Sequence, residues 1–247
     1  MACVREASAS MRCLHKAKLD RASCKSSMAQ TVFRNILCIR TLFFGNSSKL
    51  RAWRRFESAD AIADLVDKSS QFEELYGNSR VYGQYQFPIS SADFKSRLAT
   101  CWNAPWPVAS GNPSWAQVHS AASNADGAGE LLRSLIASDM ARLGWCSPPE
   151  PSDWAILLTP NSFAALDQLF PGAPRKQHVD PLLAEVVAVS LSAKLSKDKK
   201  QVVGFDRIFV EHLLSRFALY LRDGLVLDVE GRHSHSGRKR KKAKTGD

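Results

Sequence analysis

The chain has 247 residues and a formal net charge of +10, and this charge lies almost entirely at its two ends. Residues 1–55 carry twelve Lys and Arg residues against two acidic ones, and the last sixteen residues carry seven against one. Residues 56–231 carry fifteen against twenty-one, and a hydrophobic content of 45% excludes a wholly disordered chain. The sequence therefore predicts an acidic globular body with two basic extensions, which are typical of targeting signals and polyanion contacts.

The cysteine pattern and the hydropathy pattern narrow the class of protein. Four of the six cysteines precede residue 56 and no two form a CxxC pair, which argues against a disulfide framework and against a cysteine zinc site. The most apolar early run, residues 36–44, is interrupted by Arg40 and is far shorter than the roughly twenty residues that cross a bilayer. We therefore expect a soluble protein without a cofactor or a bound metal.

Residues 1–56 are predicted to be a basic leader. Their composition resembles a mitochondrial transit peptide, because they are rich in Arg and Ser and nearly free of acid, with apolar residues at 30–44. Arg54, Arg55 and Phe56 resemble the pattern that the matrix peptidase cleaves, although Glu57 departs from the small residue usual after the cut. A start at Met28 would give a leader of ordinary length. The alternative interpretation is a basic arm that contacts RNA or DNA.

Residues 231–247 are predicted to be a disordered basic tail, because they begin with a polar stretch free of large apolar residues. This stretch leads into a run rich in Lys and Arg at residues 238–244. A basic run of this kind is typical both of a nuclear-localisation signal and of a nucleic-acid contact that binds phosphates without recognising sequence. The candidate nucleic-acid-binding residues are Arg238, Lys239, Arg240, Lys241, Lys242 and Lys244.

Residues 57–230 are predicted to form a single, mainly helical domain with one or two short strands. Apolar residues recur at helical spacing, with capping residues before them and Gly or Pro after several of them. The segment 181–196 is apolar nearly all round, so we expect it to be central and buried. Residues 81–89 are a candidate for a short strand or an extended segment, and residues 154–159 are the best strand candidate, with a buried helical turn as the alternative. The predicted helices cover approximately residues 58–72, 91–101, 126–143, 161–169, 181–196 and 206–223.

Three tryptophans lie in or beside a proline-rich loop. Trp102, Trp106 and Trp115 are interspersed with three prolines in residues 105–113, which exclude a regular helix there. Such tryptophans can stack on bases or bind a partner peptide. The commoner role of tryptophans in such a loop is to hold it against the core.

The sequence contains no motif that defines a reaction. A Cys101 or Cys146 nucleophile with His119 as its base is the one catalytic arrangement that the residue types allow. We expect a non-enzymatic binding or assembly protein of the mitochondrial RNA and ribosome machinery, with the tail on RNA and the helical body on a protein partner. The alternatives are a nuclear chromatin- or RNA-associated factor and an enzyme whose site the sequence does not reveal.

Overall fold

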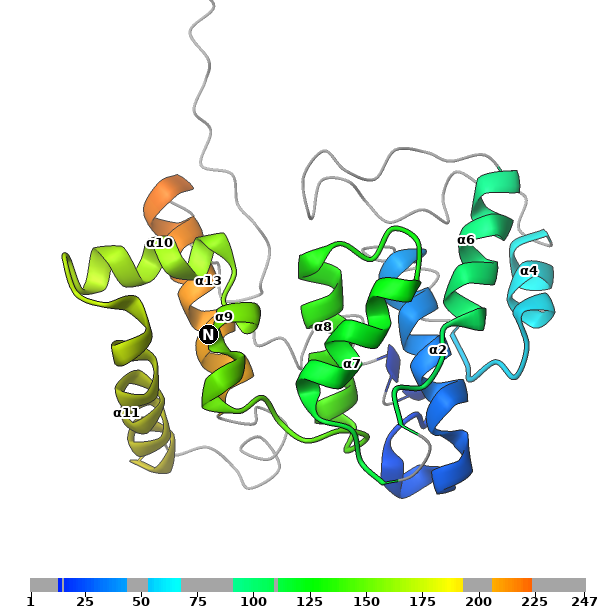
Figure 1. Cartoon of the computed structure of the whole chain (residues 1–247), viewed down its shortest axis with the longest axis horizontal. Coiled ribbons are helices and arrows are strands. Elements are labelled where there is room, and N and C mark those ends of the chain that lie inside the picture. Colours follow the sequence, from blue (N-terminus) through cyan, green and yellow to red (C-terminus); the bar gives the residue numbers. More distant parts are fainter. Residues whose placement is uncertain are drawn as a thin grey trace, which may run out of the picture. The chain divides into compact units, whose positions relative to one another are not determined.

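The computed structural model describes residues 13–14, 16–43, 53–67, 91–108, 111–192 and 206–223. This part of the chain is mainly α-helical and includes no β-strand (Figure 1). Contacts divide it into two compact units, one within Arg5–Leu157 and the other within Leu158–Asp247. None of the helices in these residues has the length and apolarity needed to cross a membrane.

The 5–157 unit is built around a helix from the segment that the sequence predicts to be a leader. In Figure 1, α2 lies between α6 and α8, with α4 on the far side of α6 and α7 against α8, and the packing contacts agree. The helices of this unit are α2 (Ala29–Thr41), α4 (Ala59–Asp67), α6 (Ser91–Asn103), α7 (Trp115–Ala121), α8 (Glu130–Arg142) and α9 (Trp154–Leu157), with 3₁₀ turns η2 (Arg21–Ser23), η3 (Ser26–Met28), η5 (Ala122–Asn124) and η6 (Pro151–Asp153).

Helix α2 is buried along most of its length. Complete burial of one such side chain contributes about 1.5–3 kcal/mol, so this helix supplies a large share of the apolar core. The boundary that the sequence suggests at residue 57 therefore falls inside a compact unit. The α2 side chains without solvent exposure include Val32, Phe33, Ile36, Leu37, Cys38 and Ile39.

The end of the predicted leader is fixed to α2 by a pair of hydrogen bonds. The Asn35 side chain donates to the carbonyl oxygen of Phe56 at 2.8 Å and accepts from the Phe56 N–H at 3.0 Å. The Phe56 ring packs edge-on against Trp53 at 4.9 Å, and each side chain is only 3% exposed. The aromatic residue expected just before a cleavage site is thus part of the core.

Residues that precede α2 are attached to the end of α8. The indole Nε1 of Trp145 donates to the carbonyl oxygen of Leu19 at 2.7 Å, and the Arg21 N–H donates to the Leu143 carbonyl at 2.9 Å. Leu14 and Leu19 have no exposed surface. The fold of this unit therefore includes residues well before α2.

The strand predicted at 154–159 is wrong, because residues 154–157 form α9. The η6 turn begins at Pro151, and the Glu150 N–H donates to the Asp153 carboxylate at 2.8 Å, so the chain enters α9 from a capped helical turn. A short apolar run fits both the helical and the strand period, and the capped turn before residue 154 favours the helix. The other strand candidate, 81–89, lies outside the described residues.

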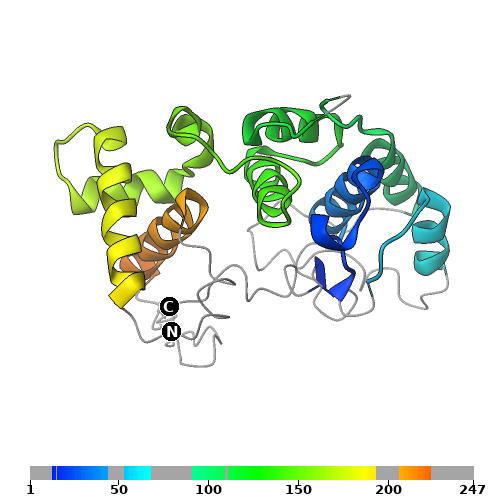
Figure 2. The same ribbon diagram turned by 90° about the horizontal axis from the view of Figure 1, so that it is seen from below.

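The 158–247 unit contains α10 (Pro160–Leu169), η7 (Arg175–His178), α11 (Val179–Ser192) and α13 (Arg207–Asp223). Helix α13 packs against both α10 and α11, as Figure 2 shows. The predicted helices at 161–169 and 206–223 are confirmed to within a residue or two. Helix α11 differs from the prediction of burial all round, because Ala184 and Ala188 are exposed on one side of it.

Candidate functional site

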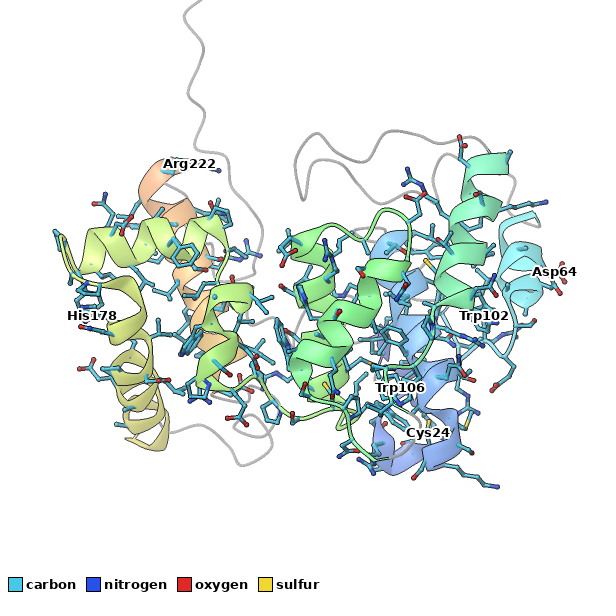
Figure 3. The ribbon with its side chains drawn as sticks, in the orientation of Figure 1. Cys24, Asp64, Trp102, Trp106, His178 and Arg222 are labelled. Carbon is cyan, nitrogen blue, oxygen red and sulfur yellow. The ribbon has the colours of Figure 1, made fainter. Side chains whose placement is uncertain are left out.

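Two of the three tryptophans singled out by the sequence lie partly exposed on the 5–157 unit. Trp102 occupies the last turn of α6, and Trp106 follows in the proline-rich segment after it. Both labelled side chains lie beside α2 and the end of α6 in Figure 3. The Trp106 ring meets the ring of Phe33 on α2 edge-on at 5.6 Å. The Trp106 indole is thus held against α2, and both indoles are partly exposed to solvent.

Arg34 adds a cation to this surface. Its guanidinium carbon lies 5.9 Å from the centre of the Trp102 ring. Arg34 makes no ion pair with an acidic side chain in the described ranges, and its Nε has no hydrogen-bond acceptor there. Burial lowers the pKa of Arg34, but an arginine stays charged in proteins. We call Arg34, Trp102 and Trp106 the Arg–Trp surface. It offers aromatic faces and a positive charge side by side, as a single-stranded nucleic acid requires.

The third tryptophan belongs to the core. Trp115 has no exposed surface, and its Nε1 donates to Oγ of Ser138 on α8 at 3.3 Å. Ser114 caps the helix that Trp115 begins, because its side chain accepts from the Gln117 N–H in a capping box. Two of the three tryptophans are therefore partly exposed, and the third is inserted into the core. Trp115 thus has the structural role that is common for tryptophans in such a loop.

His119 lies on the same helix, one turn after Trp115. The two rings stack with centroids 5.2 Å apart, and the His119 Nε2 lies 3.1 Å from the Glu130 Oε1. Burial lowers the pKa of His119, although the negative charge of Glu130 acts in the opposite direction. His119 therefore packs as a neutral ring between α7 and the start of α8.

The two candidate nucleophiles are buried thiols. Burial raises the pKa of Cys146 to about 12, and its Sγ is 3.6 Å from the Ala137 carbonyl oxygen. A thiol with so high a pKa supplies almost no thiolate at neutral pH. Cys101 contacts Thr41 and Cys38, both on α2. The contacts described above for His119 are with Trp115 and Glu130, so we assign no nucleophile–base pair.

A cluster of hydroxyl groups in the 158–247 unit was not predicted. The Glu211 Oε1 on α13 accepts from Thr159 at 3.0 Å, from Ser162 at 3.0 Å and from Ser215 at 2.8 Å. The local signals are the Thr159–Pro160 start of α10 and the spacing of four between Glu211 and Ser215. Neither signal shows that the two helices meet there.

The basic residues of the predicted tail, 238–242 and 244, lie outside the described residues. Within the described ranges, no three His, Cys, Asp or Glu side chains come together to hold a metal ion. No protein-family model, no curated protein and no solved structure matches this chain. The candidate site is therefore argued from its own geometry.

Proposed function

We propose that this protein is a non-enzymatic RNA-binding or ribonucleoprotein-assembly factor. In this proposal, bases of a single-stranded segment stack on Trp102 and Trp106 while Arg34 contacts a phosphate or a base face. The basic tail supplies further phosphate contacts that are independent of sequence. The observation that carries the proposal is the position of Arg34, which lies over the partly exposed Trp102 without an acidic partner in the described part of the chain.

The distribution of charge supports a polyanionic partner. The segment 5–157 carries eighteen Lys and Arg residues against fourteen Asp and Glu residues, and the segment 232–247 carries seven against one. Residues 158–231, by contrast, carry as many cations as anions. A polyanion would therefore be attracted to the unit that bears the Arg–Trp surface and to the tail.

For the compartment, we propose the mitochondrial matrix, with a targeting signal that is read without removal of α2. The nucleus is the second candidate, and the burial of α2 favours it. Cleavage after Phe56 would remove a helix whose apolar side chains are fully buried. A nuclear protein that uses the basic run at 238–242 as its import signal needs no such cleavage.

The test of RNA binding is fluorescence anisotropy with a labelled single-stranded RNA of mixed sequence, at several salt concentrations. Changing Trp102 or Trp106 to Leu should weaken binding roughly tenfold, because each stacked base contributes about 1–3 kcal/mol. Arg34→Gln should weaken it as well. Alanine at residues 238–242 should reduce the slope of log affinity against log salt by roughly one for each phosphate that the tail no longer neutralises.

The matched control is Tyr220→Leu, which removes an aromatic ring that is 53% exposed on the other unit. This variant should bind RNA as the unchanged protein does, and the melting temperature of every variant shows whether it folds. Equal affinities for all of the variants would contradict the Arg–Trp surface, while a loss confined to the tail variant would leave only the polyanion contact. The organelle from which the protein is isolated distinguishes the two compartments, and the protein's N-terminal mass shows whether α2 is retained.

A further inference from the structure

Two buried thiols meet where α2 packs against α6. Cys38 and Cys101 have no solvent-exposed surface. Thr41, which follows Cys38 by nearly one helical turn and therefore shares its face of α2, has its Oγ1 3.1 Å from the Cys101 Sγ. Cys38 is also the neighbour with the largest effect on the pKa of Cys101. The sequence separates these cysteines by more than sixty residues, and the fold brings both to the interface between α2 and α6.

The surroundings give the two thiols different roles. The hydrogen bond from Cys38 lowers the pKa of Cys101, and the Thr41 hydroxyl lowers it further, because both groups can donate to a Cys101 thiolate. Burial raises the pKa of Cys38. Cys101 is thus the thiol that ionises first, and Cys38 lies in position to react with it after oxidation.

We propose that Cys38 and Cys101 form an oxidation site, in which a peroxide converts the pair into a disulfide that joins α2 to α6. The Cys101 thiolate attacks one peroxide oxygen, which breaks the O–O bond, forms a sulfenic acid and releases hydroxide. Cys38 then attacks the Cys101 sulfur, the S–S bond forms, and the sulfenic oxygen leaves as water. The thiols lose two electrons and two protons, and hydrogen peroxide becomes two water molecules.

Complete burial makes this site different from an exposed sensor cysteine. The oxidant reaches the sulfur atoms only when α2 and α6 separate locally, so the rate of reaction depends on that opening. The disulfide then opposes the same opening, because it closes a loop of about sixty residues. Oxidation would thereby attach the N-terminal helix covalently to the rest of its unit.

The test uses the full chain, treated with excess hydrogen peroxide until Cys24, which is only partly buried, is completely modified. Free thiols are then alkylated, and the protein is digested with trypsin without reduction. Mass spectrometry should find the peptide 35–40 linked to the peptide 98–133, with a mass lower by two hydrogen atoms than their sum. Recovery of Cys38 and Cys101 as alkylated thiols, or linked to other cysteines, would overturn the proposal.

Variants separate the two roles. Cys38→Ser should abolish the linked peptide and leave Cys101 as a sulfenic acid that dimedone captures, whereas the control Cys24→Ser should keep the link. Oxidation of the unchanged chain and of Cys24→Ser should raise the melting temperature by roughly 10 °C, reversibly with dithiothreitol. Peptide mapping of the unchanged chain tests whether the disulfide forms, even if Cys38→Ser does not fold. This inference is independent of RNA binding.

Discussion

Arg40 of α2 and Asp139 of α8 form an ion pair in the interior of the 5–157 unit. The Arg40 Nε lies 2.6 Å from Oδ2 of Asp139, and Nη2 donates to Oδ1 at 2.9 Å. The side chains are 3% and 0% exposed, so both charges are removed from water and the two parallel hydrogen bonds must compensate for that loss. Arg40 is therefore a structural residue, although its sequence context is that of a positive charge in a leader.

We predict that Asp139→Leu alone lowers the free energy of unfolding by about 3–5 kcal/mol, because it removes the carboxylate that pairs with the buried Arg40 charge. The double variant Arg40→Met with Asp139→Leu should recover most of this loss, since apolar side chains of similar volume tolerate burial. Urea denaturation of the two single variants and the double variant measures the coupling. Strictly additive losses would contradict the prediction.

His119 makes stability depend on pH. Burial lowers its folded-state pKa below the value of about 6.5 in the unfolded chain, so the unfolded state takes up the proton more readily. The stability that the neutral ring contributes is complete above about pH 6.5 and is lost as the pH falls through the lower folded-state pKa.

We predict that the melting temperature decreases in this pH window and that His119→Phe, which can keep the stacking on Trp115, reduces the decrease. The control His178→Phe should retain the decrease, and an unchanged decrease in His119→Phe would contradict the assignment.

The start of α10 and the middle of α13 are joined by the hydroxyl cluster around Glu211. The Ser162 N–H also donates to the Thr159 side-chain oxygen at 3.4 Å, so Thr159 caps α10 while it contacts α13. We predict that Glu211→Ala lowers the free energy of unfolding by about 1–3 kcal/mol, because three hydroxyl groups then lack their common acceptor. Gln168→Ala, at an exposed position of α10, is the control and should have little effect in the same denaturation assay.

Helices with strong local signals were predictable from the sequence. Gly144 directly follows the helix predicted at 126–143, and it has a φ of +81°, a backbone conformation that glycine adopts without strain. The predicted 91–101 helix is α6, which runs two residues further. Local signals do not distinguish a helix from a strand when both fit the same short apolar run, as in the segment that forms α9. They also gave no indication of α7, which is only seven residues long.

The place of α2 in the molecule was not predictable in this way. A leader and a core helix both need an apolar face, and the residues that distinguish them lie far along the chain. Cys101 and Asp139, which contact α2, follow it by about sixty and one hundred residues. The Arg–Trp surface was predictable in part, because the sequence singled out Trp102 and Trp106 but not Arg34.

At the scale of the whole molecule, the structure groups the charged residues differently from the division into leader and body that the sequence predicts. Positive residues before 57 belong with acidic residues of 57–157 in one unit, so this unit keeps only a small excess of positive charge, eighteen cations against fourteen anions. We predict that a chain of residues 57–247 loses the fold of this unit, exposes apolar surface and binds a hydrophobic dye. Removal of residues 232–247, which belong to the predicted basic tail, is the control and should leave the unfolding transition of the 5–157 unit unchanged. A cooperative unfolding transition of the 5–157 unit in the shorter chain would contradict the prediction.

The helices that pack against α2 are synthesised after it, so α2 leaves the ribosome before its packing partners exist. At a synthesis rate of about 5–20 residues per second, roughly 5–20 s pass between the synthesis of α2 and that of α8. During that interval its apolar face and its Arg residues are available to any receptor that recognises a basic amphipathic helix. If the proposed mitochondrial targeting holds, the same segment acts as a targeting signal on the nascent chain and as a core helix in the finished protein.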